Sequence, residues 1–243
     1  MELILPDWPA PGNVHACMTT RSAGTSSGSY AGLNLGDHTG DDAGAVARNR
    51  AQLRQLLPAD PCWLKQVHGH AVCRADDPAS SRAADAAVAR QSRVVCAVLT
   101  ADCLPVLLCD RAGGVVAAAH AGWRGLAGGV LEATVAAMGV SPGDLLAWLG
   151  AAIGPQAFQV GTEVREAFVA DLPVCAEAFT PDAAPGKWRA DIYQLARLRL
   201  ARAGVGVADI FGGGLCTVTD AARFYSYRRD GATGRMASCI WRE

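Results

Sequence analysis

The sequence lacks the features that mark exported and membrane-spanning proteins. Its opening segment, MELILPDWPAPGNV, has no basic residues, and Pro6, Asp7 and Pro9 interrupt it before a signal-peptide core can form. Its most apolar stretches, such as VVCAVLT, end well short of the roughly 20 residues that cross a bilayer. We therefore expect a cytoplasmic protein that does not associate with membranes.

An excess of charge of either sign is also missing. Charged residues make up 19% of the 243 positions, hydrophobic residues make up 51%, and the formal net charge is −1. This balance argues against disorder and against a polyanionic partner such as nucleic acid. The chain also lacks internal repeats and long linkers, so we expect a single domain over residues 1–243.

Two motifs that would suggest other classes of protein are absent. The nine cysteines contain no CxxC pair and no regular spacing, as expected in a reducing compartment where most thiols are small buried side chains. The absence of GxGxxG argues against a Rossmann-like fold. Histidines are few, five in all, which restricts the places where imidazole chemistry can occur.

Three short apolar runs occupy the middle of the chain: VVCAVLT (94–100), LPVLLCD (104–110) and GVVAAAH (114–120). They predict three successive strands of an antiparallel meander. With the second turn centred between Ala112 and Gly113, His120 lies opposite Pro105 and on the same face as Cys103. The Cys103 and His120 side chains are therefore predicted to meet at one sheet edge.

Patterns on either side of these strands predict the remaining elements. They indicate a loop at 21–40, helices at 43–57, 126–138 and 160–170, a strand at 145–153, and a helix from Ile192 with Asp191 as its cap and Gly204 at its end. The helix at 126–138 has its N-terminus at the edge that carries His120. These elements predict an α+β fold, with a mixed, largely antiparallel β-sheet core flanked by helices.

The pairing of Cys103 with His120 is the feature that points to chemistry. Such a pair is either part of a metal site or a Cys/His nucleophile dyad. A third N or S ligand would decide for metal, because catalytic zinc sites have three protein ligands and an open position. His68, which ends the run WLKQVH and precedes Gly69, is the best candidate. Periodicity alone does not show that His68 folds back to this edge.

Six segments, in order along nearly the whole chain, resemble the motifs of the YfiH-type laccase-domain family, also called the polyphenol oxidase or peptidoglycan-editing-factor family. They are MTTRSAGTSSGSYAGLNLGDHTGDD, LKQVHG, LTADCLPVLL, AAAHAGWRG, GAAIGP and FYSYRRDGATGRMAS. The resemblance places the family's zinc ligands on His68, Cys103 and His120. One departure is that many members have a cysteine just after GAAIGP, where this chain has Gln156 and Ala157.

The resemblance implies a metal-dependent enzyme and offers several activities. Members are described as purine nucleoside enzymes, which phosphorolyse adenosine, inosine and methylthioadenosine or deaminate adenosine, as copper-dependent phenol oxidases, and as factors that keep wrong amino acids out of peptidoglycan precursors. Five histidines are too few for the several copper centres of a multicopper laccase. We therefore expect a purine nucleoside phosphorylase and adenosine deaminase with a zinc cofactor, copper being the alternative metal.

Charged residues near these motifs supply further candidates. Arg124, at the start of the helix after His120, is a candidate catalytic residue that receives phosphate. Asp102 is a candidate general base, an orienting group for a ligand, or a hydrogen-bonding residue of the turn. The candidate substrate contacts are Arg21, Arg228 and Arg229, each with a solvated or salt-bridged side chain as the alternative.

Two other functions remain as alternatives at this point. One is a hydrolase that cleaves an amide in a cell-wall precursor with metal-activated water. The other is a non-catalytic protein with a structural zinc, although structural sites usually have four protein ligands and only three are visible here. The sequence leaves the oligomeric state open.

Overall fold

Fourteen strands form three sheets in the computed structural model, which describes residues 1–243. The five-stranded sheet has the order β1 (Leu3–Ile4), β2 (Val14–Thr19), β14 (Met236–Arg242), β6 (Val95–Thr100), β3 (Pro61–Cys62). The six-stranded sheet has the order β13 (Ile210–Gly212), β9 (Leu145–Leu149), β7 (Leu104–Asp110), β8 (Val116–Ala121), β5 (Ala86–Ala89), β4 (Val72–Arg74). The small third sheet has the order β10 (Gln159–Gly161), β12 (Lys187–Ala190), β11 (Phe179–Pro181).

Six α-helices and four short 3₁₀ turns complete the chain. The helices are α1 (Ala43–Arg54), α2 (Trp123–Ala127), α3 (Val130–Met138), α4 (Thr162–Val169), α5 (Ile192–Arg202) and α6 (Tyr227–Asp230). The 3₁₀ turns are Gly28–Tyr30, Pro142–Asp144, Pro173–Ala178 and Val207–Asp209. The predicted α+β class with a mixed, largely antiparallel core is confirmed. None of these helices combines the length and the hydropathy needed to span a membrane.

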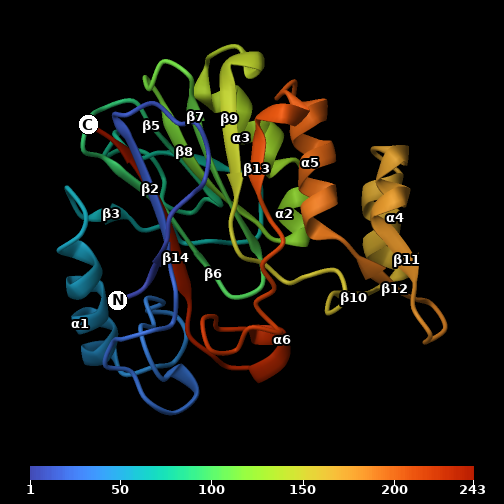
Figure 1. Ribbon diagram of the computed structural model, residues 1–243, viewed down its shortest axis with the longest axis horizontal. Helices are drawn as coiled ribbons and strands as arrows, with labels where there is room; N and C mark the ends of the chain where they lie inside the picture. The colour runs from blue at the N-terminus through green and yellow to red at the C-terminus, as the bar shows by residue number, and fades with distance from the viewer.

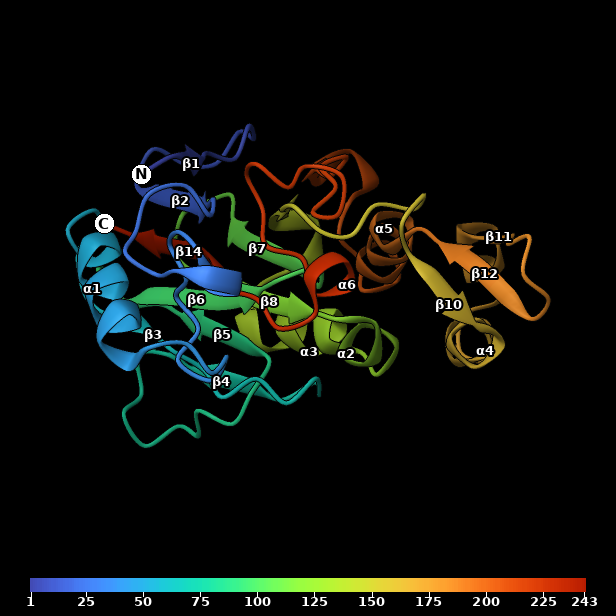
Figure 2. The same cartoon turned by 90° about the horizontal axis from the view of Figure 1, so that it is seen from below.

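The two large sheets pack face to face between layers of helix (Figure 1). Met18 and Val98 of the five-stranded sheet share one buried cluster with Leu107 and Ala118 of the six-stranded sheet. On the outer side of the six-stranded sheet, α2, α3 and α5 bury their apolar residues in a second cluster. On the outer side of the five-stranded sheet, α1 inserts Leu53 into a third. Figure 2 shows α4 and the small sheet beyond α5, at one end of the molecule.

The predicted three-stranded meander is half right. Pro105 pairs with His120 in the antiparallel β7–β8 ladder, as the register predicted. The prediction is wrong for the first run, because β6 pairs with β14 and β3 in the other sheet and does not pair with β7. Asp102, with a φ of +91°, lies in the segment that carries the chain from one sheet to the other. Every residue of β6 is buried, so its sequence has no alternation that would identify its partner strand.

The other predicted elements exist with shifted ends. The helix predicted at 126–138 is divided into α2 and α3 at Gly128 and Gly129, and Gly129 has a φ of +92°. The helix predicted at 43–57 ends at Arg54, and the strand predicted at 145–153 leaves its ladder after Leu149. The predicted cap of α5 is present, since the Asp191 carboxylate accepts the Tyr193 and Gln194 N–H groups.

Candidate metal centre

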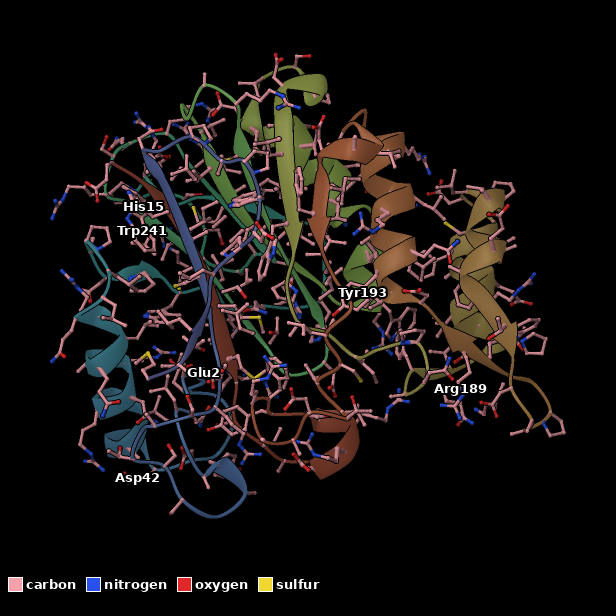
Figure 3. The ribbon with its side chains drawn as sticks, viewed as in Figure 1. Glu2, His15, Asp42, Arg189, Tyr193 and Trp241 are labelled. Atoms are coloured by element: carbon pink, nitrogen blue, oxygen red, sulfur yellow. The ribbon has the colours of Figure 1, made fainter.

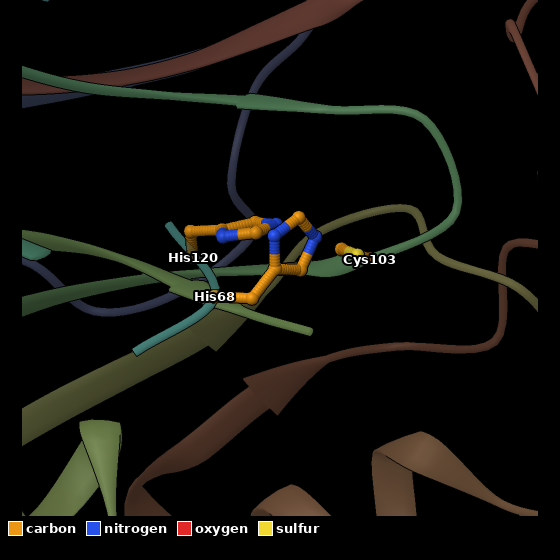
Figure 4. A group of neighbouring side chains, drawn as sticks. All are labelled: His68, Cys103 and His120. Carbon is orange, nitrogen blue, oxygen red and sulfur yellow. The ribbon is translucent and has the colours of Figure 1, made fainter. Parts of the chain in front are cut away.

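Three potential metal ligands converge at one end of the β7–β8 hairpin (Figure 4). Their ligand atoms, from His68, Cys103 and His120, all lie within 4.8 Å of one another. The two imidazole rings meet edge to face, with centroids 4.9 Å apart and an interplanar angle of 76°. His120 is only 3% exposed, whereas His68 is exposed. The cluster therefore has one buried side and one side open to ligands.

Each ligand comes from a different kind of local structure. Cys103 directly precedes β7, and His120 lies near the end of β8, so the antiparallel pairing brings them together. His68 lies in the loop between β3 and β4, with a φ of +59°. Gly122 leaves the space in which the three meet, because a Cβ atom there would lie 2.9 Å from Cys103 Sγ and 3.1 Å from His68 Cδ2.

Asp85, which the sequence did not single out, connects two of the ligands. Its Oδ1 atom lies 2.8 Å from His120 Nδ1 and accepts the His68 backbone N–H at 2.9 Å. Its Oδ2 atom accepts the Val67 and Gly69 N–H groups at 3.2 and 2.7 Å. With Asp85 as acceptor, Nδ1 of His120 holds the proton and Nε2 is free to bind a metal. The same carboxylate holds the His68 loop in its left-handed conformation.

The electrostatics of the cluster favour a thiolate. Burial by itself would raise the pKa of the Cys103 thiol, but the imidazoles of His120 and His68 lower it to about 6. Burial disfavours the charged form of His120, yet Cys103 and Asp85 raise its pKa to about 9. Without a metal, Cys103 and His120 therefore form a thiolate–imidazolium pair at neutral pH. A cation at the centre would replace the imidazolium proton as the partner of the thiolate.

The donor set fits a transition-metal ion. Two imidazole nitrogens and one thiolate are typical of zinc sites, and a three-ligand set leaves a position for substrate or water. The carboxylate behind His120 is the usual outer partner of a metal-bound histidine. No other three His, Cys, Asp or Glu side chains of this chain form such a group. His15, for example, stacks on Trp241 at 5.5 Å (Figure 3).

Two cavities meet at these ligands, and both are lined by His68, Ala101, Cys103 and Tyr227. The first, of about 240 Å³, is mostly apolar and is also lined by Asp102, Trp123, Arg124, Ile153, Phe158, Ile192 and Arg228. The second, of about 310 Å³, is more polar and is also lined by His38, Gln66, Leu99, Thr100, His120 and Arg235. A molecule in either cavity can therefore reach the metal centre.

Asp102 lies in the wall of the first cavity, but its carboxylate is already engaged. Its Oδ1 atom accepts the Thr217 hydroxyl at 2.5 Å, and its Oδ2 atom accepts the Arg228 backbone N–H at 2.6 Å. These bonds tie the segment before Cys103 to the start of α6. The arrangement suits a residue that positions the site.

The four predicted arginines divide into two pairs. Arg124 and Arg228 line the first cavity, and the Arg124 guanidinium stacks over Trp123 at 4.4 Å with no carboxylate partner. Arg21 and Arg229 lie outside both cavities. Arg21 donates to two backbone carbonyls, and Arg229 donates to three and pairs with Asp230. The structure therefore brings Arg124 and Arg228 to the metal ligands and leaves Arg21 and Arg229 apart from them.

Sequence reasoning missed Asp85 and Arg235. Asp85 has a weak signal, since it is the single charged residue in the small-residue run AADAAVA. Arg235 lies in the motif FYSYRRDGATGRMAS, but nothing in the sequence distinguishes it from Arg228 and Arg229 in the same motif. Neither residue is near the ligands in sequence.

This chain is similar to known proteins over nearly its whole length. A family described as multi-copper polyphenol oxidoreductase laccase matches residues 15–243. A purine nucleoside phosphorylase of Pseudomonas aeruginosa is 56% identical over 238 residues, covering 98% of this chain and 97% of that protein. The purine nucleoside phosphorylase YfiH of Escherichia coli is 54% identical over 243 residues, covering 99% and 98%.

Solved structures show the same fold. A Neisseria meningitidis protein has a TM-score of 0.95 at 52% identity, with both chains fully covered. YlmD of Geobacillus stearothermophilus has a TM-score of 0.86 at 31% identity, covering 100% of this chain and 97% of that one.

Proposed function

The chain belongs to the family described as multi-copper polyphenol oxidoreductase laccases, and we propose that it is a zinc-dependent purine nucleoside phosphorylase. The observation that carries the proposal is the single His68–Cys103–His120 cluster at the junction of two cavities. A reaction of two substrates needs two adjoining binding spaces. The names of the relatives at 54% and 56% identity support the same activity.

Zinc is the metal that the donors suit best. When bound by two imidazoles and a thiolate, it supplies a Lewis acid next to an open position. Copper also binds such a set, but oxygen reduction by a laccase needs further copper centres. No other group of three ligands is present for them. A metal-assisted transfer of a ribosyl group from a nucleoside to phosphate therefore fits these residues better than phenol oxidation.

Phosphate is expected at the mouth of the first cavity. Arg124 and Arg228 line this cavity and also an adjoining hollow of about 270 Å³ that contains Lys187 and Glu163. Arg124 has no carboxylate partner, so its guanidinium is available for bidentate hydrogen bonds to an oxyanion. Arg228 donates one N–H to the Gln159 carbonyl and keeps others free. The Asp102 carboxylate positions Arg228 by accepting its backbone N–H.

The test joins metal analysis with product analysis. Protein purified without an affinity tag should contain about one zinc per chain and convert adenosine and phosphate to adenine and ribose 1-phosphate. Inosine as the product would reveal deamination, the second activity expected at this site. Release of amino acids from cell-wall precursors without nucleoside turnover would support the hydrolase alternative. Brisk oxidation of phenols by the zinc form, again without nucleoside turnover, would overturn the proposal.

A further inference from the structure

Arg235 is an arginine in the wall of the second cavity that has donors to spare. It lies one residue before β14, and the cavity that it lines also exposes the three metal ligands. Its Nη1 atom donates to the Thr233 and Gly234 carbonyls at 2.8 and 3.0 Å. Its Nε and Nη2 atoms have no protein acceptor, and no carboxylate pairs with it.

The side chain is held in place although its outer donors are free. The Arg235 backbone N–H donates to Asn34 Oδ1 at 2.9 Å, and the aliphatic stem lies against Gly36, where a Cβ would meet Arg235 Cγ at 2.8 Å. The partly buried guanidinium has lost part of its hydration, and its Nε and Nη2 donors have gained no protein acceptor in return. A ligand in the cavity would supply that acceptor.

The rest of the cavity favours a purine over a second phosphate. Tyr227 and Leu99 provide aromatic and aliphatic surface for a planar ring. The positive side chains of the first cavity, Arg124 and Arg228, already provide the site for phosphate. The two substrates would then meet at the residues that both cavities share, which include His68 and Cys103.

We propose that Arg235 binds N7 of the purine in the second cavity and stabilises the base as it leaves. The inference rests on the proposed function and deepens it by assigning the leaving-group contact. N7 is an acceptor in both 6-amino and 6-oxopurines, and arginine is the common partner of the N7/O6 edge of a 6-oxopurine. Arg235 would thereby be a catalytic residue, and no carboxylate forms an ion pair with its guanidinium.

The step balances with nucleoside and hydrogen phosphate as the only reactants. A phosphate oxygen forms a bond to C1′ of the ribose while the C1′–N9 bond breaks, and the bonding pair moves onto the purine. Arg235 stays protonated and donates a hydrogen bond to N7, where part of the new negative charge resides. The proton of the phosphate ester then passes to the purine, leaving ribose 1-phosphate dianion and neutral base. A preorganised donor is most effective where charge develops in this way.

The turnover experiment compares inosine with 7-methylinosine, whose N7 is blocked and whose base leaves without becoming an anion. Arg235→Met should lower kcat for inosine about 100- to 1,000-fold, and should lower it less than about tenfold for 7-methylinosine. Arg235→Lys, which keeps the charge, should have a kcat for inosine between those of the wild type and Arg235→Met. Arg90→Met is the matched control, because Arg90 donates to carbonyls at the end of α3, outside both cavities. Metal content and melting temperature are measured for every variant.

A binding experiment keeps the inference separate from the proposed function. The wild-type protein should bind inosine about 10- to 100-fold more tightly than 7-deazainosine, which lacks the N7 acceptor, and Arg235→Met should remove that difference. If wild type shows this preference without any turnover, the phosphorylase assignment fails and the contact stands. If wild type turns over inosine but Arg235→Met slows inosine and 7-methylinosine equally, the leaving-group role is overturned. Equal binding of inosine and 7-deazainosine by wild type would overturn the contact itself.

Discussion

Asp85 and His120 form a buried pair, with Oδ1 and Nδ1 2.8 Å apart and with side chains 0% and 3% exposed. The two residues also share a backbone hydrogen bond, since the His120 N–H donates to the Asp85 carbonyl at 2.7 Å. Because the other oxygen of Asp85 holds the backbone beside His68, one carboxylate orients two of the three metal ligands. The arrangement of the three potential ligands therefore depends on a residue that is not one of them.

Asp85→Asn should weaken metal binding by about 10- to 100-fold, the usual effect of losing an outer partner of a ligand. An amide has one acceptor oxygen, so either His120 or the His68 loop loses its hydrogen bond. Competition with a chromophoric chelator measures the affinity. Asp110→Asn is the matched control, because Asp110 is also buried and accepts the Gly114 and Val115 N–H groups at the far end of β7. Equal affinities for Asp85→Asn and wild type would show that Asp85 serves only the fold.

Cys103→Ser should abolish stoichiometric metal and leave the fold intact. A hydroxyl does not ionise at neutral pH, whereas the pKa of the Cys103 thiol is about 6, so the thiolate is the form that binds. Elemental analysis and a circular dichroism spectrum measure the two properties. His15→Ala and His38→Ala, which change histidines outside the ligand set, should retain the metal. One metal per chain in Cys103→Ser would remove the thiolate from the centre.

The meeting of Cys103 with His120 could be predicted because it depends on a local hairpin. Only a short turn separates β7 from β8, and the position of that turn fixes the pairing of Pro105 with His120. The pairing of β6 could not be found in this way. Its main partner, β14, follows more than a hundred residues later, and the uniformly buried β6 does not reveal which neighbour it faces.

The polar partners of the site were harder to predict than the ligands. Asp85 acts through contacts with residues 67–69 and 120, which the fold brings together from two separate segments. A short sequence window around Asp85 shows only a carboxylate in an alanine-rich run. Arg235 and Arg229 likewise look alike in the sequence. In the fold, the donors of Arg229 are taken by carbonyls and Asp230, whereas Arg235 keeps N–H groups without an acceptor. The sequence shows where the arginines are, but it does not show which of them have N–H groups free to bind a ligand.

Asn49→Leu should destabilise the fold by about 2–3 kcal/mol, because it leaves buried polar groups without partners. Asn49 lies on α1, and its amide accepts the Thr25 N–H at 2.8 Å and donates to Ser26 Oγ and the Asn34 carbonyl, both at 2.9 Å. These bonds hold the long loop that precedes α1. Urea denaturation measures the loss. Asn13→Ala, which removes one side-chain hydrogen bond to Gly113, should cost about 1 kcal/mol or less. Equal losses for the two variants would contradict the central role given to Asn49.

Arg124→Met should raise the KM for phosphate about 10- to 100-fold and leave the metal content unchanged. The substitution keeps an unbranched side chain that can still cover Trp123, but it removes the guanidinium that lies 4.4 Å from that ring. Since Arg124 has no carboxylate partner, the loss of charge breaks no ion pair within the protein, so stability should change little. Initial rates at several phosphate concentrations, together with a melting curve, separate binding from folding.

The control for Arg124→Met is Arg202→Met. Arg202 pairs with Asp171 at 2.6 Å at the C-terminal end of α5 and lines neither cavity. Arg202→Met should therefore change stability slightly and leave the phosphate KM as it is. An Arg124→Met protein that folds stably and keeps the wild-type phosphate KM would place the oxyanion elsewhere. Arg228 would then be the next candidate, because it lines the same cavity. Its Nη1 already donates to the Gln159 carbonyl. The other N–H groups of Arg228 would then have to bind the phosphate. In that case Arg228→Met should increase the KM for phosphate while zinc stays bound.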